Sequence, residues 1–269
     1  MNEPAGIWFG AGMAAVGLID STGFSHDTGA AGAVGAAVVL VVVDDVWLEL
    51  TGEIEGFDID MLHQVSQAIF GDPNKLNFKV LTYAQRIPAL ENGDVDIVAH
   101  SFTINCARWQ QIDFSTEYYH AGQKVLVRTD STAKGIGDLN GKKVCAAKGS
   151  TNIDELKNYP QVVVVPVDDL TDCLVLFQQG SVDAITGDDT VLAGFVKQDP
   201  YAVIVGDRLT DEPYGLGINK DHPEFVQFVN SMLEQMRSDG TWKKLYEKWL
   251  GTATPAPSPP PAVYGRSAS

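Results

Sequence analysis

Three short polar segments carry residue types that could bind a small charged molecule. Residues 100–108 (HSFTINCAR) offer hydroxyls, backbone amides and the guanidinium of Arg108. Residues 148–152 (KGSTN) open a predicted helix, whose N-terminal amides attract anions. Residues 187–190 (GDDT) place two carboxylates at the start of another predicted helix. A guanidinium and a helix N-terminus bind a carboxylate, and an aspartate binds an ammonium. Together the segments match the zwitterionic head of a free α-amino acid.

Each of these residues also has an interpretation that needs no ligand. Arg108 could form a surface ion pair. Ser150, Asp188 or Asp189 could simply cap a helix, because serine and aspartate are common caps. Their positions favour a shared site, since each segment follows a predicted strand. Ligands of open α/β sheets bind beyond the carboxyl ends of the strands, where such segments meet.

A succession of predicted strands and helices between residues 53 and 250 positions these segments. Short apolar runs, typical of buried strands, alternate with amphipathic stretches, typical of helices. Predicted strands cover residues 78–81, 95–99, 125–127, 143–147, 162–167, 183–186, 202–205 and 215–218. Predicted helices lie near residues 61–69, 87–90, 170–177, 190–197 and 225–236, with others starting near Asn152 and at a Thr241 cap. This alternation predicts an α/β fold with largely parallel sheets and helices on both faces.

Charge and composition exclude several classes of partner. The chain has 269 residues and a formal net charge of −16. Nucleic acids and anionic membranes are bound through basic patches, so neither is expected as a partner. The five histidines are scattered, and none of the three cysteines lies in a C-x-x-C pair. The sequence therefore predicts no metal site and no cofactor.

The two ends of the chain differ from the middle. Residues 1–52 form an atypical N-terminal segment that contains no basic residue. Within it, residues 30–43 are an apolar run, shorter than the ~20 residues of a spanning helix. This run could be the hydrophobic part of a signal peptide, although no basic residue precedes it, or a buried strand. Residues 252–269 are rich in proline, serine and alanine, which predicts a disordered tail.

Several motifs in residues 53–251 resemble those of one protein family. Gly56–Met61 (GFDIDM) resembles the signature of the family 3 solute-binding proteins, the polar-amino-acid receptors of ABC importers. Residues 86–96 (RIPALENGDVD) fit the family's R-x-P-x-L-x-x-G-x-x-D run. Thr103–Arg108 is similar to its T-x-T-x-x-R segment, with Asn105 in place of the second Thr. Further matches are Asp113–Ser115, Tyr118, Val144–Thr151, Gly180–Ala184, Pro213–Gly215 and Gly240–Gly251.

The resemblance implies a two-lobed, periplasmic-binding-protein-like fold of type II. Each lobe would be a sheet flanked by helices, and two hinge strands would join the lobes. Lobe 1 would comprise residues 53–123 and 217–251, and lobe 2 residues 126–212. The hinge strands would lie near residues 125–128 and 213–218. Closure of the lobes around the ligand would be the functional motion.

The resemblance also implies which residues would bind the carboxylate end of an amino acid. Arg108 is expected to bind the α-carboxylate directly. Thr103 would assist from the same segment, and the backbone amides of Ser150 and Thr151 would assist from the segment after residue 147. These four residues come from two different strand ends, so the fold must bring them together.

At the other end of the ligand, Asp188 is expected to bind the α-ammonium with help from the backbone carbonyl of Ser101. Tyr83 stands where the family places an aromatic ring over the ligand. Arg86 and Lys148 are candidate partners for a side-chain carboxylate, which would favour glutamate or aspartate over glutamine. Either could equally face solvent, where such side chains usually remain.

The pairing of the three cysteines indicates the cellular compartment of the protein. The resemblance is to a Gram-positive branch in which such a pair in lobe 2 is common, and it implies a disulfide between Cys145 and Cys173. A disulfide indicates an oxidising, extracytoplasmic location. The alternative is two buried free thiols. Cys106 would have no partner. The main departure from the family is the N-terminal segment, which lacks a clear signal peptide or lipoprotein cysteine and suggests a divergent or altered N-terminus.

The expected function is that of an extracytoplasmic receptor that binds free glutamate, aspartate or glutamine and delivers it to an ABC permease. We expect a monomer that is secreted or anchored on the outer face of the cytoplasmic membrane. One alternative is a sensor subunit that reports to a membrane signalling partner. A second is a dehydratase-like enzyme on the same fold, with Asp189 or Glu117 as general acid.

Overall fold

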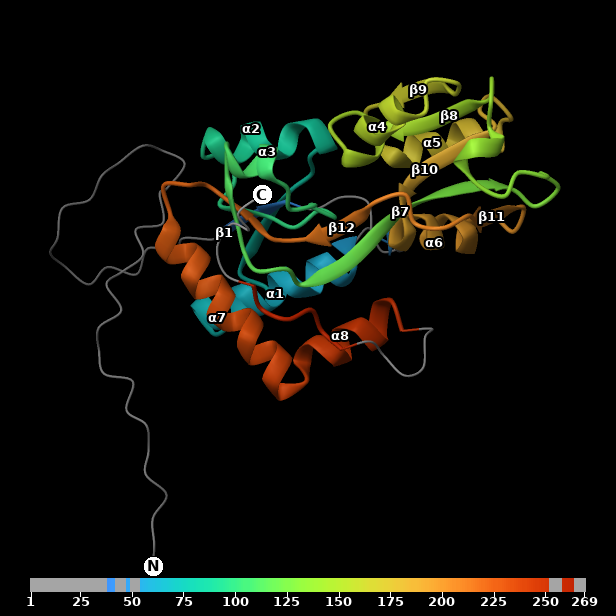
Figure 1. Ribbon diagram of the computed structural model, residues 1–269. Coiled ribbons are helices and arrows are strands. Elements are labelled where there is room, and N and C mark those ends of the chain that lie inside the picture. The colour runs from blue at the N-terminus through green and yellow to red at the C-terminus, as the bar shows by residue number, and fades with distance from the viewer. Residues whose placement is uncertain (1–37, 42–46, 49–53, 252–257, 264–269) are drawn as a thin grey trace, which may run out of the picture. The chain divides into compact units, whose positions relative to one another are not determined.

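The computed structural model describes residues 38–41, 47–48, 54–251 and 258–263 (Figure 1). Most of the atypical N-terminal segment and most of the proline-rich tail lie outside these residues, as do the predictions made for them. Within the apolar run, Val38–Val41 form strand β1. No helix in the described part of the chain has the length and apolar character needed to cross a bilayer.

The first sheet has five strands in the order β4-β1-β5-β13-β6. Its other members are β4 (Leu76–Lys79), β5 (Ile97–Val98), β13 (Gly217–Ile218) and β6 (Asp113–Phe114). β1 runs parallel to both β4 and β5, whereas β13 is antiparallel to β5 and β6. The helices that accompany this sheet in the sequence are α1 (Phe57–Phe70), α2 (Arg86–Glu91), α3 (Cys106–Trp109), α7 (Pro223–Asp239) and α8 (Thr241–Trp249). A two-stranded ribbon, β2 (Trp47–Leu48) with β3 (Ile54–Glu55), precedes α1.

The second sheet has the order β11-β7-β10-β8-β9, with β12 paired to β7. Its strands are β7 (Tyr119–Arg128), β8 (Lys143–Ala147), β9 (Val163–Val167), β10 (Ala184–Asp188), β11 (Ala202–Val205) and β12 (Asp211–Tyr214). The helices between them are α4 (Thr151–Glu155), α5 (Leu170–Gln178) and α6 (Asp189–Gln198). The α/β class and the two-lobed fold predicted from the sequence are confirmed.

The prediction of largely parallel sheets is wrong, because both sheets are mixed. β7 is antiparallel to β10, β11 and β12. The chain leaves the first sheet on β7 and returns to it after β12, so these two strands must run in opposite directions (Figure 1). Residues 119–122 of β7 pair with residues 211–214 of β12. Residues 125–128, where a hinge strand was expected, pair instead with β10 and β11 inside the second sheet.

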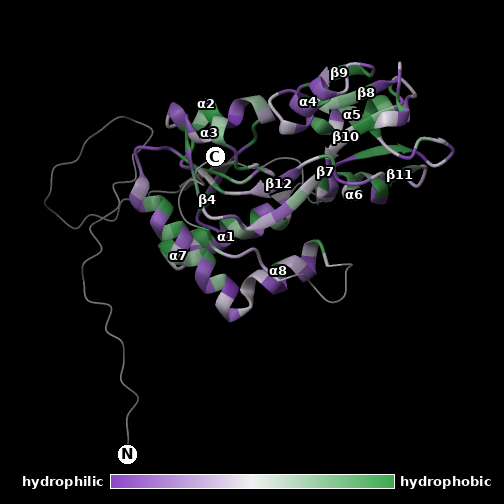
Figure 2. Ribbon diagram, in the orientation of Figure 1, coloured by the Kyte–Doolittle hydropathy of each residue, from purple (hydrophilic) through white to green (hydrophobic). Residues whose placement is uncertain are grey.

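Alternation of side chains along β7 buries both faces of the second sheet. Leu126 packs into one hydrophobic cluster with residues of α5 and α6. Val125 and Val127 point the other way, into a cluster with Leu139 and Leu156. Near the first sheet, α7 is buried along one side only, and Figure 2 shows hydrophobic and hydrophilic residues alternating around it.

A cysteine pair and a helix cap were predicted from the sequence, and the structure bears on both. Cys145 on β8 and Cys173 on α5 form a disulfide, which confirms the predicted pair. Cys106 is free and exposed. The prediction that Thr241 caps the last helix is wrong, because Gly240 occupies the cap position with φ +81° and Thr241 is already helical. Glycine adopts this left-handed conformation without the steric cost of a Cβ.

Candidate functional site

The segment after β5 turns sharply at Ser101. Ser101 has φ +42°, and it is the one residue besides glycine with a positive φ among the residues that the structure describes. Its amide donates a hydrogen bond of 2.9 Å to Oδ2 of Asp58 on α1. The Ser101 side chain is buried. This turn sets the direction of the following residues, Phe102 and Thr103.

Two buried guanidiniums lie against the ring of Phe102. Arg86 is 4.3 Å and Arg108 is 5.0 Å from the ring centroid. Nη1 of Arg108 donates to the carbonyl of Thr103 at 2.7 Å. Both arginines also donate to the carbonyl of Gly149 at 3.2 Å, in the segment after β8. The structure therefore brings together two of the three predicted segments.

Arg86 at the start of α2 donates to backbone carbonyls and does not face solvent. It is 1% exposed, and it donates to the carbonyls of Tyr83 at 3.0 Å and His100 at 2.9 Å. The solvent-facing alternative for Arg86 is therefore wrong. Burial and the charges of Arg86 and Arg108 hold the pKa of His100 well below its ordinary value, so this imidazole is neutral.

The segment after β8 approaches the first sheet closely at Gly149. Gly149 has φ +77°, and a Cβ there would lie 2.7 Å from Cα of Ala84. Ser150 caps the five-residue helix α4, since its Oγ accepts from the amide of Ile153 at 3.2 Å. Its hydroxyl donates to the carbonyl of Ala147. Ser150 is thus a helix cap, and its position next to Gly149 also places it beside the two arginines.

Asp188 ends β10 and is almost completely buried. Its Oδ2 accepts from the hydroxyl of Tyr214 at 2.6 Å, and its Oδ1 accepts from the side-chain amide of Asn152 at 2.8 Å. Burial raises the pKa of the Asp188 carboxyl to about 7, and the nearby charge of Glu212 acts in the same direction. Asp189, by contrast, forms an ion pair of 2.8 Å with Arg208. The two neighbouring aspartates therefore have different environments.

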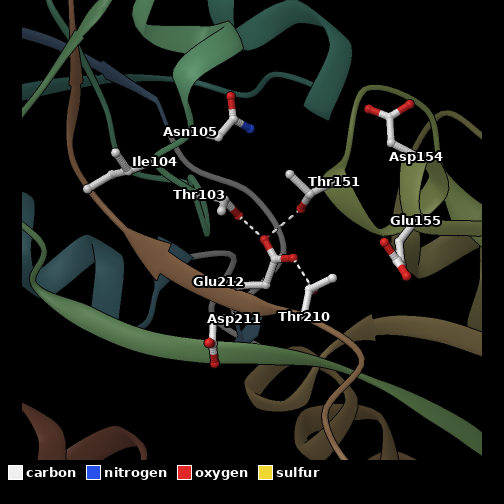
Figure 3. A pocket seen from close by; sticks show the side chains of 9 residues that line it. All are labelled: Thr103, Ile104, Asn105, Thr151, Asp154, Glu155, Thr210, Asp211 and Glu212. Carbon is white, nitrogen blue, oxygen red and sulfur yellow. Dashed lines mark hydrogen bonds between the residues drawn. The ribbon is translucent and has the colours of Figure 1, made fainter. Parts of the chain in front are cut away.

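Sequence reasoning missed Glu212. This residue of β12 is 1% exposed, and a single oxygen, Oε2, accepts from Thr103 at 2.6 Å and from Thr151 at 2.7 Å. Thr210 donates to its other oxygen (Figure 3). One carboxylate thus joins hydroxyls from the strand-end segments of both sheets. The available signal was its position directly before the Pro213–Gly215 match.

Glu212 lines a cavity of about 370 Å³ between these segments. Two of the predicted ligand residues, Thr103 and Thr151, line the same cavity. The remaining lining residues are Ile104, Asn105, Asp154, Glu155, Thr210 and Asp211 (Figure 3). Four of the nine lining side chains are carboxylates and none is basic. Arg108, which donates to the carbonyl of Thr103, can balance one ligand carboxylate beside this cavity. Any further negatively charged group is electrostatically disfavoured there.

The remaining predicted residues lie in different environments. Tyr83 is buried in the hydrophobic cluster of the second sheet, and its ring centroid lies 4.5 Å from that of His100. Lys148 is half-exposed and forms a 2.8 Å ion pair with Asp168. Glu117, considered as a general acid, contacts exposed His120. Within the described ranges, no group of three or more His, Cys, Asp or Glu residues could hold a metal ion.

Comparisons with known proteins agree with this geometry. The sequence model of "Bacterial extracellular solute-binding proteins, family 3" matches residues 46–252. The ABC transporter glutamine-binding protein GlnH of Bacillus subtilis is 37% identical over 202 residues, which are 74% of each chain. The glutamate-binding protein GluB of Corynebacterium glutamicum is 33% identical, over 74% of this chain and 72% of that protein. A solved structure, "An ancestral arginine-binding protein bound to glutamine", has a TM-score of 0.75 and 33% identity, and the match covers 80% of this chain and 98% of that one.

Proposed function

The chain belongs to the bacterial extracellular solute-binding proteins, family 3, and from that premise we propose that it binds free glutamine between its two lobes and delivers it to an ABC permease. The family consists of solute-binding proteins, so the chain is a receptor and not an enzyme. We assign lobe 1 to residues 53–123 and 217–251 and lobe 2 to residues 126–212. Both lobes contribute to the site, which supports a ligand held between them.

The proposed contacts to the amino-acid head use the buried charges of both lobes. Arg108, with Thr103 and the amides of Ser150 and Thr151, would bind the α-carboxylate. This assignment is supported by the hydrogen bond of 3.2 Å that Arg108 donates to the carbonyl of Gly149. The bond places the guanidinium beside the start of α4. A guanidinium suits a carboxylate because it can donate two parallel hydrogen bonds.

Asp188 would bind the α-ammonium, assisted by the carbonyl of Ser101, and Tyr83 would cover the ligand. Asp188 is buried and lies near enough to Glu212 and Arg108 to be influenced by their charges. A carboxylate with a pKa of about 7 still ionises at neutral and higher pH, and an ammonium ligand would stabilise the ionised form.

The choice of glutamine rests on one observation, the carboxylate of Glu212 in the cavity. A glutamate or aspartate ligand would bring a second carboxylate towards Glu212, and like charges repel strongly at low dielectric. Arg86 donates to four backbone carbonyls through all three guanidinium nitrogens, whereas Arg108 donates to two. Lys148, the other candidate for neutralising such a ligand, is paired with Asp168. A neutral carboxamide avoids this conflict.

Arginine is the second candidate ligand, because a cationic side chain would gain from the same carboxylates. Transport is proposed on the strength of the relatives' names, and a membrane sensor is the alternative partner. The family description, extracellular solute-binding proteins, supports a location outside the cytoplasm. We further propose that it acts as a monomer, secreted or anchored to the outer face of the cytoplasmic membrane.

Calorimetric titration with glutamine, glutamate, aspartate and arginine tests the proposed ligand. We expect one glutamine per chain, with glutamate at least about tenfold weaker, which corresponds to about 1.4 kcal/mol. Glu212→Gln keeps an oxygen that accepts from the threonines but removes the charge. This variant should narrow the preference for glutamine over glutamate. Tighter binding of glutamate than glutamine by the wild type would contradict the proposal, and tighter binding of arginine would favour the second candidate.

A further inference from the structure

Asp58 is a buried carboxylate to which the proposed ligand contacts assign no role. It lies in the first turn of α1 and is 2% exposed. Its Oδ1 accepts from the hydroxyl of Tyr118 at 2.6 Å, and its Oδ2 accepts from the amide of Ser101 at 2.9 Å. Burying a carboxylate is unfavourable unless hydrogen bonds compensate for the lost water. These two bonds therefore explain how the carboxylate is tolerated, and they join α1 to the segment after β5.

The Ser101 end of this link is a strained backbone. A residue with a Cβ is disfavoured at φ +42°, and such a conformation persists only where its surroundings hold it. The amide that donates its hydrogen bond to Asp58 belongs to the strained residue itself. Asp58 thus holds the amide at one end of the N–Cα bond about which φ is measured.

The left-handed turn determines where the Ser101 carbonyl points. In an extended strand, successive carbonyls point in opposite directions. Here the carbonyls of His100 and Ser101 both accept from Nη1 of Arg86, at 2.9 and 3.4 Å. The turn therefore brings two successive carbonyls to the same side, and it fixes the start of the short path from Ser101 to Thr103, whose carbonyl contacts Arg108.

We infer that Asp58 is a positioning residue for amino-acid binding, which holds the Ser101 amide and so fixes the turn that aims the Ser101 carbonyl and places Thr103. This inference rests on the proposed function, because Ser101 and Thr103 are proposed ligand contacts. Asp58 does not touch the ligand itself. It acts through the backbone of the segment that does.

Three variants separate positioning from general stability. Asp58→Ala removes the acceptor, and we expect the dissociation constant for glutamine to rise at least tenfold. Asp58→Asn retains an oxygen for the Ser101 amide, so its dissociation constant for glutamine should stay within about threefold of the wild-type value. Asp60→Ala is the matched control on the same helix, because Asp60 binds Lys248 and Trp249 on α8 instead of the ligand segment. It should weaken the α1–α8 contact with less than a threefold change in affinity.

A second substitution tests the backbone mechanism. Glycine adopts a positive φ without a Cβ clash. In the Asp58→Ala background, Ser101→Gly should therefore recover at least threefold of the lost affinity, although it restores no hydrogen bond. Failure of Ser101→Gly to recover affinity would contradict the mechanism. So would an Asp58→Ala variant that is folded, by near-ultraviolet circular dichroism, and binds as tightly as the wild type.

Amide hydrogen exchange gives a readout that needs no ligand. The Ser101 amide should exchange at least tenfold faster in Asp58→Ala than in the wild type, and at an unchanged rate in Asp60→Ala. An unchanged Ser101 rate in Asp58→Ala would overturn the inference. If the wild type bound another amino acid in place of glutamine, the affinity comparison would use that amino acid. The exchange measurement therefore distinguishes failure of this inference from failure of the proposed ligand.

Discussion

Asp188 shows how a residue proposed to bind the ligand can oppose the stability of the fold. Its carboxylate is buried, and burial raises its pKa from 3.8 to about 7. The folded protein therefore binds a proton at Asp188 more tightly than the unfolded chain does. The contribution of this group to stability is fully present below about pH 4 and is lost as the pH rises through about 7. A site for an ammonium ion thus costs stability at the pH at which it would act.

Asp188→Asn should remove this penalty. The substitution resembles the protonated carboxyl in size and neutrality, so it should leave stability at pH 4 nearly unchanged. At pH 8 it should raise the free energy of unfolding by up to about 4 kcal/mol, from a shift of about three pKa units at 1.36 kcal/mol each. Urea unfolding of both proteins between pH 4 and 8 measures the difference. A difference that does not vary with pH would show that Asp188 titrates normally.

Asp183 provides a control for this experiment, because its pKa is shifted in the opposite direction from that of Asp188. A hydrogen bond from the Lys143 amide lowers the pKa of the Asp183 carboxyl, and Lys142 acts in the same direction. Its contribution is therefore present above the ordinary aspartate pKa and is lost as the pH falls. Asp183→Asn should make the protein less stable at pH 8, where Asp188→Asn makes it more stable.

At the scale of elements, the disulfide joins β8 to α5 within one hydrophobic cluster. The two cysteines are separated by 28 positions, and closing a loop of this length lowers the entropy of the unfolded chain. The crosslink therefore stabilises lobe 2, the lobe that carries Asp188 and α4. It also indicates that the protein matures in an oxidising compartment.

Removal of the disulfide should destabilise the protein measurably. Replacing Cys145 and Cys173 together by alanine should lower the free energy of unfolding by about 2–4 kcal/mol. Denaturant unfolding of the wild type with and without reductant provides the same comparison without mutation. Cys106→Ser, at an exposed free thiol, is the control and should change little. Equal stability of the reduced and oxidised wild type would contradict this expectation.

The elements differ in how well the sequence predicts them, and the reason is physical. β8 and β11 were predicted with correct bounds, because apolar runs with turn residues beside them indicate buried strands. Only the last two residues of β12 fell within an expected strand, the hinge near 213–218, because Asp-Glu-Pro-Tyr has no apolar alternation. Its pairing with β7 is the main reason that it is a strand. The first half of β7 is similarly polar, so only Val125–Val127 were expected.

The candidate site likewise contains features that the sequence predicts and features that it does not. The three strand-end segments were predicted to meet because ligands of α/β sheets bind beyond the carboxyl ends of the strands, and the structure brings these segments together. Glu212 was not found, because its partners Thr103 and Thr151 are separated from it by 109 and 61 positions. The bonds of Arg86 to the segments after β5 and β8 were also hidden, since sequence does not show which arginine is buried. Contacts distant in sequence therefore required the structure.

At the scale of the whole molecule, β7 and β12 are the two antiparallel strands of the described residues that carry the chain between the sheets, and the candidate site lies where the strand ends of both sheets meet. Glu212 sits on the returning strand and contacts a threonine from each side. A ligand that binds both lobes shifts the equilibrium towards closure, because its contacts are complete only in the closed arrangement. On the proposed assignment, both ends of the amino acid are needed for tight binding.

The most direct test of this account is a calorimetric titration at pH 8 with glutamine and two analogues that each lack one charge. Asp188 is ionised at this pH, which lies above its pKa of about 7. The α-amide of glutamine lacks the carboxylate for Arg108, and N-acetylglutamine lacks the ammonium for Asp188. Glutamine should bind with one site per chain, and each analogue should bind at least about 100-fold more weakly, or about 2.7 kcal/mol. Binding of either analogue within tenfold of glutamine would contradict the central claim.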